Sequence, residues 1–295
     1  HRWLGAGSDT PQPARCIVVE ERIVGWVDFD VDREWLEPGE VNVGYNVFAV
    51  HRGKGYASRA VQLLMHHLAV SGEAHTATLL VDPGNEPSLA VASRCRFVPS
   101  GEINGSCYFR RPVPPLEYSD GVVTIRRQRP NDLEADLAAK DDEQIDWLWL
   151  PGERDAWETM TSDERRAHAL RCLLESGSRF EAGPKWAFSV DSPDGAYVAY
   201  VDCDLANDQV PSGEANVSYS AHPAHRGKGY VVRAVRLIVQ FLSDHTGARQ
   251  VHLLIDEENL KSLRVAQAVG AVATHRWVND RGDTMVRHVL SLVGP

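Results

Sequence analysis

The sequence has few residues that could form covalent or metal cross-links. Its cysteines are odd in number and widely scattered: Cys16, Cys95, Cys107, Cys172 and Cys203. It contains no C-x-x-C pair, so it indicates neither a disulfide framework nor a zinc site. We therefore expect no metal, and a reducing cytoplasm as the compartment.

Long apolar runs and an excess of basic residues are also lacking. No stretch approaches the roughly 18 apolar residues of a membrane span, and the opening HRWLGAGSDTPQPAR has no apolar signal-peptide core. The net charge of −10 argues against a nucleic-acid partner, which would need a basic face. It mildly favours cationic or amine partners, although an acidic surface also simply serves solubility.

What the sequence does contain is a repeat. The stretch HRGKGY occurs at residues 51–56 and again at 225–230, an offset of 174 residues. Matches continue at this offset without a gap: VGWVD with VAYVD, GEVNV with GEANV, and LLVD with LLID. In a chain of 295 residues this indicates two copies of one domain, and the period is far too long for a solenoid.

A proline-rich stretch, RRPVPPLEYSDG, separates the copies and is typical of a linker. We predict an N-terminal domain at 1–111, a linker at 112–121 and a C-terminal domain at 122–295. After the linker the pattern predicts a strand at 122–126, helices over 131–180 and a strand at 186–190.

The two copies differ in what precedes them. Only 23 residues come before VGWVD in the first copy, against more than sixty between the linker and VAYVD in the second. The chain also opens on His1 rather than Met. We expect that residues are missing before His1, and that the N-terminal domain lacks its first strand and helices.

Each HRGKGY lies between an expected strand and an expected helix. Apolar residues alternate before it (Val41, Val43, Tyr45, Val47; Ala215, Val217, Tyr219, Ala221) and recur with helical spacing after it (Val61, Leu64, Met65, Leu68; Val235, Ile238, Val239, Leu242). Glycines at such a junction leave main-chain N–H groups unobstructed, and a helix N-terminus adds positive potential. The pattern therefore predicts an anion site, with phosphate the expected anion.

Two common phosphate motifs do not fit this turn. The Walker pattern requires Ser or Thr after the Lys, where Gly55 and Gly229 stand. The dinucleotide pattern requires a third Gly, where Ser58 and Val232 stand. A phosphate-binding turn of another kind remains.

The stretch resembles the signature [RQ]-x-x-G-x-[GA] of the GNAT superfamily of acyl-CoA-dependent N-acyltransferases. It reads RGKGYA from Arg52 and RGKGYV from Arg226, with Val231 departing from the expected Gly or Ala. A second family element, a strand ending near an Asn and then a helix ending in a Gly-aromatic pair, covers 79–97 and 253–271. Arg96 stands in place of the Gly in the first copy, and Ala271 in place of the aromatic in the second.

The Asn-x-x-Ser form of this element is most similar to the RimJ/RimL-like branch, which acetylates protein N-termini and small amines. The resemblance covers about 16–110 and 122–290. It implies an α+β fold of two tandem GNAT domains, each a mixed, mostly antiparallel twisted sheet flanked by helices, with acetyl-CoA as co-substrate. It places these residues at the cofactor: Val47, Arg52, Gly53, Lys54, Gly55, Tyr56, Ala57, Asn85, Ala221, Arg226, Gly227, Lys228, Gly229, Tyr230, Val231 and Asn259.

The implied reaction is attack of a neutral amine on an acetyl thioester. The enzyme must hold the thioester, polarise its carbonyl and take a proton from the amine. In the family a main-chain N–H of the splayed strand contacts the carbonyl, which corresponds here to the region of Val47 or Ala221. Such a donor is worth about 2.7–4 kcal/mol in other enzymes.

Glu40 and Glu214, at the head of these strands, are the candidate bases, with an exposed strand-end charge as the alternative. Asn42 and Asn216 follow on the same strand face. Many relatives have Glu at this Asn position, whereas Asn could only orient a water. His51 and His225, directly before the signature, and His222 are weaker candidates.

The general acid is the least defined part of the site. Many relatives use a Tyr seven residues after the Asn, where this sequence has Ala92 and Ala266. The resemblance leaves Ser88 and Ser262 as replacements, and a helix-capping serine is the alternative reading of both.

Residues 132–146 carry seven acidic side chains and one Lys. They either recruit a cationic substrate or form a solvated helix face. Trp147, Trp149 and Trp157 either line an acceptor pocket or pack in the core.

We expect an acetyltransferase whose acceptor is a primary amine on a small molecule or a peptide N-terminus, with no membrane partner and a monomeric or homodimeric state. The C-terminal copy is the better catalytic candidate because it retains the segment expected to bind the acceptor. Two alternatives stay open, a non-catalytic CoA-binding regulatory module and a mycothiol-synthase-like acetyltransferase.

Overall fold

The computed structural model describes residues 14–149 and 152–292. The expected loss of residues before His1 therefore lies outside the described part. The chain consists of two compact units. The first runs to Pro115 and includes Asp244–Gly247, and the second comprises Leu116–Ser243 and the residues from Ala248 onward. The exact domain and linker limits stay a prediction.

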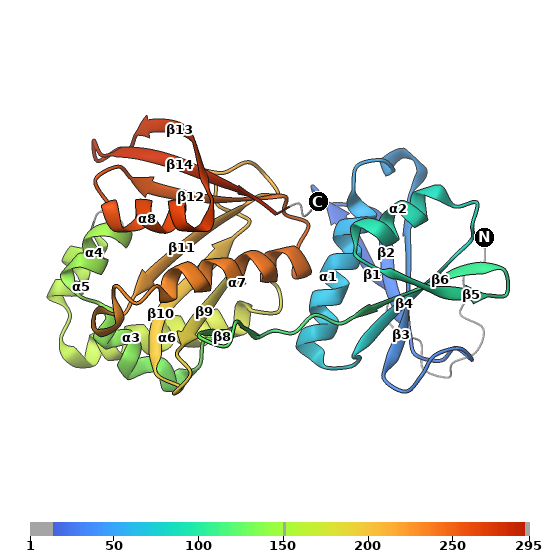
Figure 1. Cartoon of the computed structure of the whole chain (residues 1–295), viewed down its shortest axis with the longest axis horizontal. Helices are drawn as coiled ribbons and strands as arrows, with labels where there is room; N and C mark the ends of the chain where they lie inside the picture. Colours follow the sequence, from blue (N-terminus) through green and yellow to red (C-terminus); the bar gives the residue numbers. More distant parts are fainter. Residues whose placement is uncertain (1–13, 150–151, 293–295) are drawn as a thin grey trace. The chain divides into compact units, whose positions relative to one another are not determined.

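The first unit is a twisted sheet with helices packed against it (Figure 1). Its elements are β1 (Arg15–Val19), β2 (Arg22–Asp30), β3 (Glu40–Val47), the 3₁₀ turn η1 (Ala49–His51), α1 (Tyr56–Ser71), β4 (Thr76–Val81), α2 (Glu86–Arg94), β5 (Val98–Ile103) and β6 (Ser106–Pro112). The strand order is β1-β2-β3-β4-β6-β5. Of these pairs, β3 and β4 are parallel and the others antiparallel.

The second unit repeats this plan and extends it. Its elements are β7 (Tyr118–Ser119), β8 (Thr124–Arg127), η2 (Pro130–Asp132), α3 (Leu133–Ala139), α4 (Asp142–Leu148), α5 (Glu153–Thr159), α6 (Ser162–Arg179), β9 (Lys185–Asp191), β10 (Tyr197–Asp204), β11 (Ala215–Ala221), η3 (Pro223–His225), α7 (Tyr230–His245), β12 (Gln250–Asp256), α8 (Leu260–Val269), β13 (Val272–Val278) and β14 (Thr284–Ser291). The order is β13-β14-β12-β11-β10-β9-β8-β7, with β11 and β12 the parallel pair.

These sheets confirm the predicted fold class. Each is mixed and mostly antiparallel, and each is flanked by helices. The strands and helices expected on either side of HRGKGY are β3 and α1 in the first unit and β11 and α7 in the second. The segment expected to be helical, 131–180, folds into α3 to α6. No helix among the described residues is long and apolar enough to cross a membrane.

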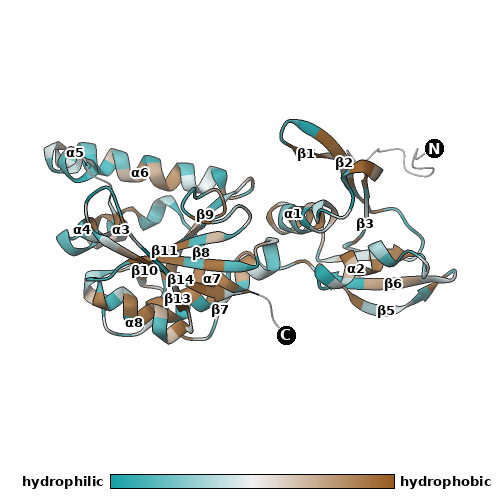
Figure 2. Ribbon diagram, turned by 90° about the horizontal axis from the view of Figure 1, so that it is seen from above, coloured by the Kyte–Doolittle hydropathy of each residue, from teal (hydrophilic) through white to brown (hydrophobic). Residues whose placement is uncertain are grey.

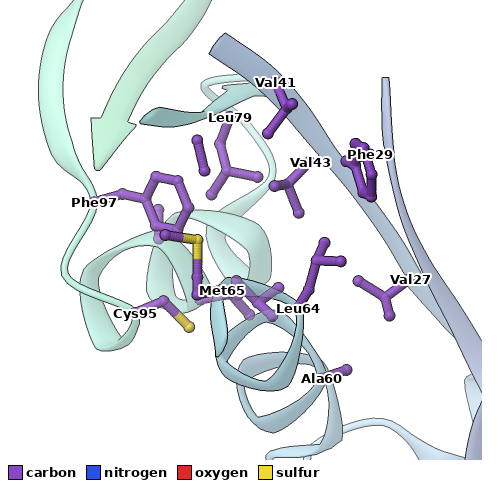
Figure 3. Close-up of a cluster of buried hydrophobic side chains, with 14 of the residues drawn as sticks. Val27, Phe29, Val41, Val43, Ala60, Leu64, Met65, Leu79, Cys95 and Phe97 are labelled. Atoms are coloured by element: carbon purple, nitrogen blue, oxygen red, sulfur yellow. The ribbon is translucent and has the colours of Figure 1, made fainter. Parts of the chain in front are cut away.

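Alternation along the strands gives each sheet an apolar face and a polar face. In the first unit the apolar side chains of β2, β3 and β4 pack with Leu64 and Met65 of α1 and with Phe97 beyond α2 (Figure 3). Leu64 and Met65 are almost fully buried. Burying a side chain of this size stabilises a fold by roughly 1.5–3 kcal/mol. Both helices therefore lie on this face, which leaves the even-numbered residues of the strands on the other.

The second unit has the same division of faces. Figure 2 shows α6 and α8 on opposite sides of the sheet. Tyr219 of β11 donates its hydroxyl to the main-chain oxygen of Ser262 in α8. The odd-numbered residues of β11 thus face α8, and the even-numbered residues face the side of α6.

A buried ion cluster joins the start of the second sheet to its helices. Arg126 of β8 forms paired hydrogen bonds with Asp132, at 2.9 and 2.8 Å, and with Asp191 of β9, at 2.5 and 3.0 Å. Ser189 also donates to Asp132 at 2.6 Å. Burial alone would raise the pKa of Asp132, but these hydrogen bonds outweigh burial and lower it.

Replacing Arg126 by Met should destabilise the second unit by roughly 3–5 kcal/mol at neutral pH, because two buried carboxylates lose their cation. Asp132 has a lowered pKa, so its contribution is present above its unfolded pKa and is lost as the pH falls. The deficit should therefore shrink toward pH 4. Urea unfolding of R126M at pH 7 and pH 4 measures it. The matched control is R129M, whose pair with Glu117 is exposed and should contribute at most about 1 kcal/mol. Equal effects of the two variants would contradict this account.

Candidate active site

In both units the parallel strand pair opens shortly after it starts. In the first, β3 pairs with β4 from Glu40↔Thr76 to Asn42↔Thr78, although both strands continue beyond. In the second, β11 pairs with β12 only at Ala215↔Val251 and Asn216↔His252. The strands then diverge, which exposes one edge of β3 and of β11. This is the splayed strand that the resemblance implies.

Main-chain donors point into each opening. Phe48 donates its N–H to Val24 of β2 at 2.9 Å, and His222 donates to Val198 of β10 at 3.0 Å. Alternation in an antiparallel pair turns the N–H groups of the preceding residues, Val47 and Ala221, to the other edge, where β4 and β12 have diverged. The geometry suits the predicted carbonyl-binding role of Val47 and Ala221, which stays a prediction.

The glycine turns follow the splayed strands. Gly53 and Gly55 have φ of +79° and +80°, and Gly227 and Gly229 both have +76°. This left-handed conformation favours glycine. A Cβ added at any of the four would meet no atom within 4 Å, so the main chain there is open to a ligand. The first N–H groups of α1 and α7 have no partner within their helices. An open cradle of this kind suits a diphosphate.

The side chains of the two signature arginines are occupied within the protein. Arg52 donates through Nε to the main-chain oxygen of Val47 at 2.9 Å. Arg226 binds both oxygens of Asp141 at 2.6 Å and one of Glu143 at 2.9 Å. We therefore expect an anion to contact main-chain N–H groups and Lys54 or Lys228, while the arginines brace the turn.

The Asn-x-x-Ser element is a helix cap. Asn85 caps α2 by accepting the N–H of Ser88 at 3.2 Å, and Asn259 caps α8 by accepting that of Ser262 at 3.0 Å. The alternative reading of the serines as caps is wrong, because the asparagines hold that position and shape the first helical turn. The catalytic role of Ser88 and Ser262 stays a prediction, as does a cofactor contact of Asn85 and Asn259.

No other residue of the helix takes the place of the tyrosine that many relatives use. Ala92 and Ala266 are both fully buried. Tyr219 instead reaches the first turn of α8 from the splayed strand, with its hydroxyl 3.3 Å from the main-chain oxygen of Ser262. Burial raises the pKa of Tyr219 to about 12, so its hydroxyl stays protonated.

The polar face of the second sheet gathers the remaining candidates. We define it as the side chains Tyr200, Asp202, Glu214, Asn216, Ser218 and His252, which share one face by register. Tyr200 donates to Asp202 at 2.7 Å, and Asn216 donates to Ser218 at 3.3 Å. Nε2 of His252 donates a hydrogen bond to the carboxylate of Glu214. The structure thus brings Glu214 and Asn216 together, as the sequence predicts, and adds the other four.

The equivalent face of the first unit is arranged differently. Glu40 is buried and forms an ion pair with Arg110 of β6. Thr78, which stands where His252 stands in the second unit, donates to Asn42 at 3.4 Å. Glu40 is therefore not the exposed strand-end charge of the alternative reading.

Sequence reasoning missed Asp202 and His252. Asp202 belongs to a pentapeptide that recurs in both copies, which was a usable signal. His252 had none, because Thr stands at its repeat position and its partner Glu214 lies 38 residues away. Near the turn, His222 accepts the N–H of Ala224 at 3.3 Å, and burial, followed by His225 and Arg226, lowers its pKa.

The acidic run at 132–146 is paired with cations throughout. Each of its carboxylates has a basic partner in the second unit: Arg126, Arg166, Lys140, Arg226, Arg154 or Lys261. Paired carboxylates are poor recruiters of a cationic substrate. Trp157 is buried and packs edge-on against Trp149, with ring centroids 5.3 Å apart, whereas Trp147 is exposed. Within the described residues, no group of three or more His, Cys, Asp or Glu could hold a metal ion.

Two mixed sheets, each with a splayed parallel pair and an open glycine turn, form the framework that the resemblance to the GNAT superfamily implies. The sequence model of the acetyltransferase (GNAT) domain matches residues 2–98 and 123–272, which together exceed half of the chain. The chain belongs to the GNAT acetyltransferase family, and the prediction of two tandem GNAT domains is confirmed. Its chemistry is acetyl-CoA-dependent acyl transfer.

Solved structures similar to this chain include the ribosomal-protein-S5-alanine acetyltransferase of Vibrio fischeri, at 14% identity and a TM-score of 0.49, covering 59% of this chain and 96% of that one. RimJ of Mycobacterium smegmatis, in complex with CoA-disulfide, has 16% identity and a TM-score of 0.47, covering 58% and 82%. No curated protein matches the chain in sequence. The family assignment therefore rests on the two domain matches, and the RimJ/RimL-like branch stays a prediction.

The buried carboxyl of Asp202 should make stability depend on pH. Burial raises its pKa, and Lys185 and Tyr200 offset only part of the effect. A raised pKa means that the contribution of Asp202 to stability is present below its unfolded pKa of about 3.9 and is lost as the pH rises. The Asp202→Asn variant should therefore gain stability relative to the parent as the pH rises from 4 to 7. Urea unfolding of both at these pH values measures the difference, and a difference that does not change with pH would refute this assignment.

Proposed function

We propose that the second domain transfers the acetyl group of acetyl-CoA to a primary amine, carried by a small molecule or a peptide N-terminus. The observation that carries the proposal is the joint presence, in one domain, of an open glycine turn, a main-chain donor directed into the opening and a polar face with acid-base groups at the point where the strands part. Cytoplasmic location and a monomeric or homodimeric state stay predictions.

The residues present fit acetyl-CoA. Main-chain N–H groups of Gly227–Val231, with Lys228, would hold the diphosphate, and those of Gly53–Ala57, with Lys54, would do so in the first domain. Bound acetyl-CoA supplies an acetyl group activated as a thioester. The N–H of Ala221 would polarise its carbonyl, a donor worth about 2.7–4 kcal/mol in other enzymes.

Glu214 and Asn216 lie where the acceptor substrate would need a group that takes up its proton. The side chain of Glu214 is 18% exposed, so it is both within reach of solvent and partly shielded. A general base positioned in this way typically contributes a factor of about 10²–10⁴ to the rate. Ser262 is our candidate for returning a proton to the leaving thiolate.

For the first domain we propose a different role, as a CoA-binding module without transfer activity. Its glycine turn is as open as that of the second domain. Glu40, however, is only 1% exposed in its side chain and is neutralised by Arg110. A carboxylate that is buried and bound by an arginine is not available to an incoming substrate.

Gly55→Ala and Gly229→Ala test the turns. Each should cost only about 1–2 kcal/mol of stability, since no atom is near the added methyl but the left-handed conformation is strained. Each should also weaken CoA binding at its own domain at least about tenfold, an affinity change of about 1.4 kcal/mol. Calorimetric titration with CoA measures both sites. The controls are Gly105→Ala and Gly195→Ala, which have equally open left-handed conformations outside the HRGKGY segments. If the turn variants bind CoA as tightly as the controls, the phosphate assignment is wrong.

Turnover separates the enzyme from a simple binder. With acetyl-CoA and a panel of amines (ethylamine, lysine and peptides with free N-termini), free thiol should appear in proportion to acetylated amine. Gly229→Ala should remove most of this activity and Gly55→Ala little. CoA binding without any amine-dependent thiol release would exclude transfer to amines and favour the regulatory alternative.

A further inference from the structure

His252 lies at the point where β11 and β12 separate. It is opposite Asn216 in the last paired position of the two strands, on the same face. Its side chain is 3% exposed. Neighbouring strands of a sheet lie about 4.7–4.9 Å apart, so His252 and Asn216 are immediate neighbours.

One nitrogen of His252 is occupied and the other is not. Nε2 bonds to the carboxylate of Glu214, while Nδ1 is buried and has no hydrogen-bond partner. A carboxylate can only accept, so Nε2 carries a proton, and in the neutral imidazole Nδ1 then presents a lone pair. His252 is thus held as the tautomer whose Nδ1 can take up a proton, and Glu214 stabilises the resulting cation.

Asn216 offers a second unpaired acceptor beside the first. Its Nδ2 donates to Ser218, and its Oδ1 is buried without a partner. A buried acceptor that has no donor is costly, and in native proteins an ordered water or a ligand usually supplies one. Two neighbouring acceptors match the two protons of one water molecule. The oxygen of that water would keep its lone pairs for a further donor.

The groups around this pair favour a positively charged donor. Asp202, Asp204 and Tyr200 of β10 share the face with Asn216. Arg287 of β14 shares the face with His252 but is directed elsewhere, donating to Gln209 at 2.5 Å. Lys185 of β9 lies 3.8 Å from Asp202. Asp136 of α3, near Tyr200, is paired with Lys140.

We propose, on the basis of the proposed amine acetyltransferase function, that His252 and Glu214 accept the proton of the incoming ammonium through a water held by Asn216. The ammonium N–H bond breaks and its electron pair stays on nitrogen. The water takes that proton as it passes one of its own to Nδ1 of His252. The neutral amine is then the nucleophile, and His252 later releases its proton to solvent.

In the first domain the equivalent positions do not form this relay. Thr78 replaces His252 and donates a hydrogen bond to Oδ1 of Asn42, and Arg110 forms an ion pair with Glu40. In the second domain Val289 lies opposite His252, where Arg110 lies opposite Thr78 in the first. The proposal therefore places amine deprotonation in the second domain alone.

The kinetic test compares an amine that needs deprotonation with one that does not. With ethylamine, which is charged at pH 7, His252→Gln should lower kcat about 100-fold or more, and raising the pH should recover much of the loss. With trifluoroethylamine, which is largely neutral at pH 7, the loss should be only a few-fold. Glu214→Gln should lower kcat with ethylamine as well. The kcat of the variant that carries both substitutions should be no lower than that of His252→Gln. Thr78→Val is the matched control in the first domain.

Three outcomes separate the ideas. Equal losses with both amines, at unchanged CoA affinity, would overturn the relay and leave the acetyltransferase function standing. No amine-dependent thiol release by the parent protein would overturn the function itself, and the relay with it. A crystal structure of the parent at high resolution gives a readout that does not depend on turnover, and it should show one water within hydrogen-bond distance of Nδ1 of His252 and Oδ1 of Asn216. A dry site there would also overturn the relay.

Discussion

The divergence of one parallel strand pair is the constraint on which the rest of each domain depends. Leaving main-chain N–H and C=O groups without partners costs free energy. A sheet whose strands separate after two or three residues must therefore offer these groups to another partner. On the other edge the antiparallel neighbours, β2 and β10, pair with the splayed strands up to their last residues, Val47 and Ala221. One edge of each splayed strand is therefore held by its neighbour, and the main-chain groups of the other edge have no strand partner. The glycine turn and helix that follow continue this row of main-chain donors around a corner.

The two domains share this framework but differ in the side chains placed upon it. In the first, Glu40, Asn42, Thr78 and Arg110 satisfy one another. In the second, Glu214 and His252 are paired, while two acceptors beside them are not. Thr78 and Arg110 face each other in the first domain, and His252 and Val289 stand at these positions in the second. With this exchange, two polar atoms are left without hydrogen-bond partners. The family match alone does not distinguish the two domains in this way, because both domains share the framework that it detects.

The parts of the site that depend on local chemistry could be predicted from the sequence. Left-handed glycines, strand alternation and helical spacing are properties of a few consecutive residues, which is why the turn, β3 and α1 were predicted. Partnerships across strands could not be, since His252 and Glu214 meet only through the register of β11 and β12. The same limit applies to Asp141 and Glu143, which lie more than eighty residues before Arg226 in the chain. The asparagine caps were missed because both Asn and Ser favour that position.

The incomplete polar set in the second domain bears on specificity as well as on rate. A buried acceptor without a donor costs about 1–3 kcal/mol, and a ligand that supplies the donor recovers that energy. A site of this kind rejects an analogue that lacks the N–H group more strongly than an apolar pocket rejects one of the wrong size. It also rejects an acceptor that brings only lone pairs. Since the carboxylates of α3 and α4 are paired with cations, we propose that the polar face, where the strands separate, recognises the amine.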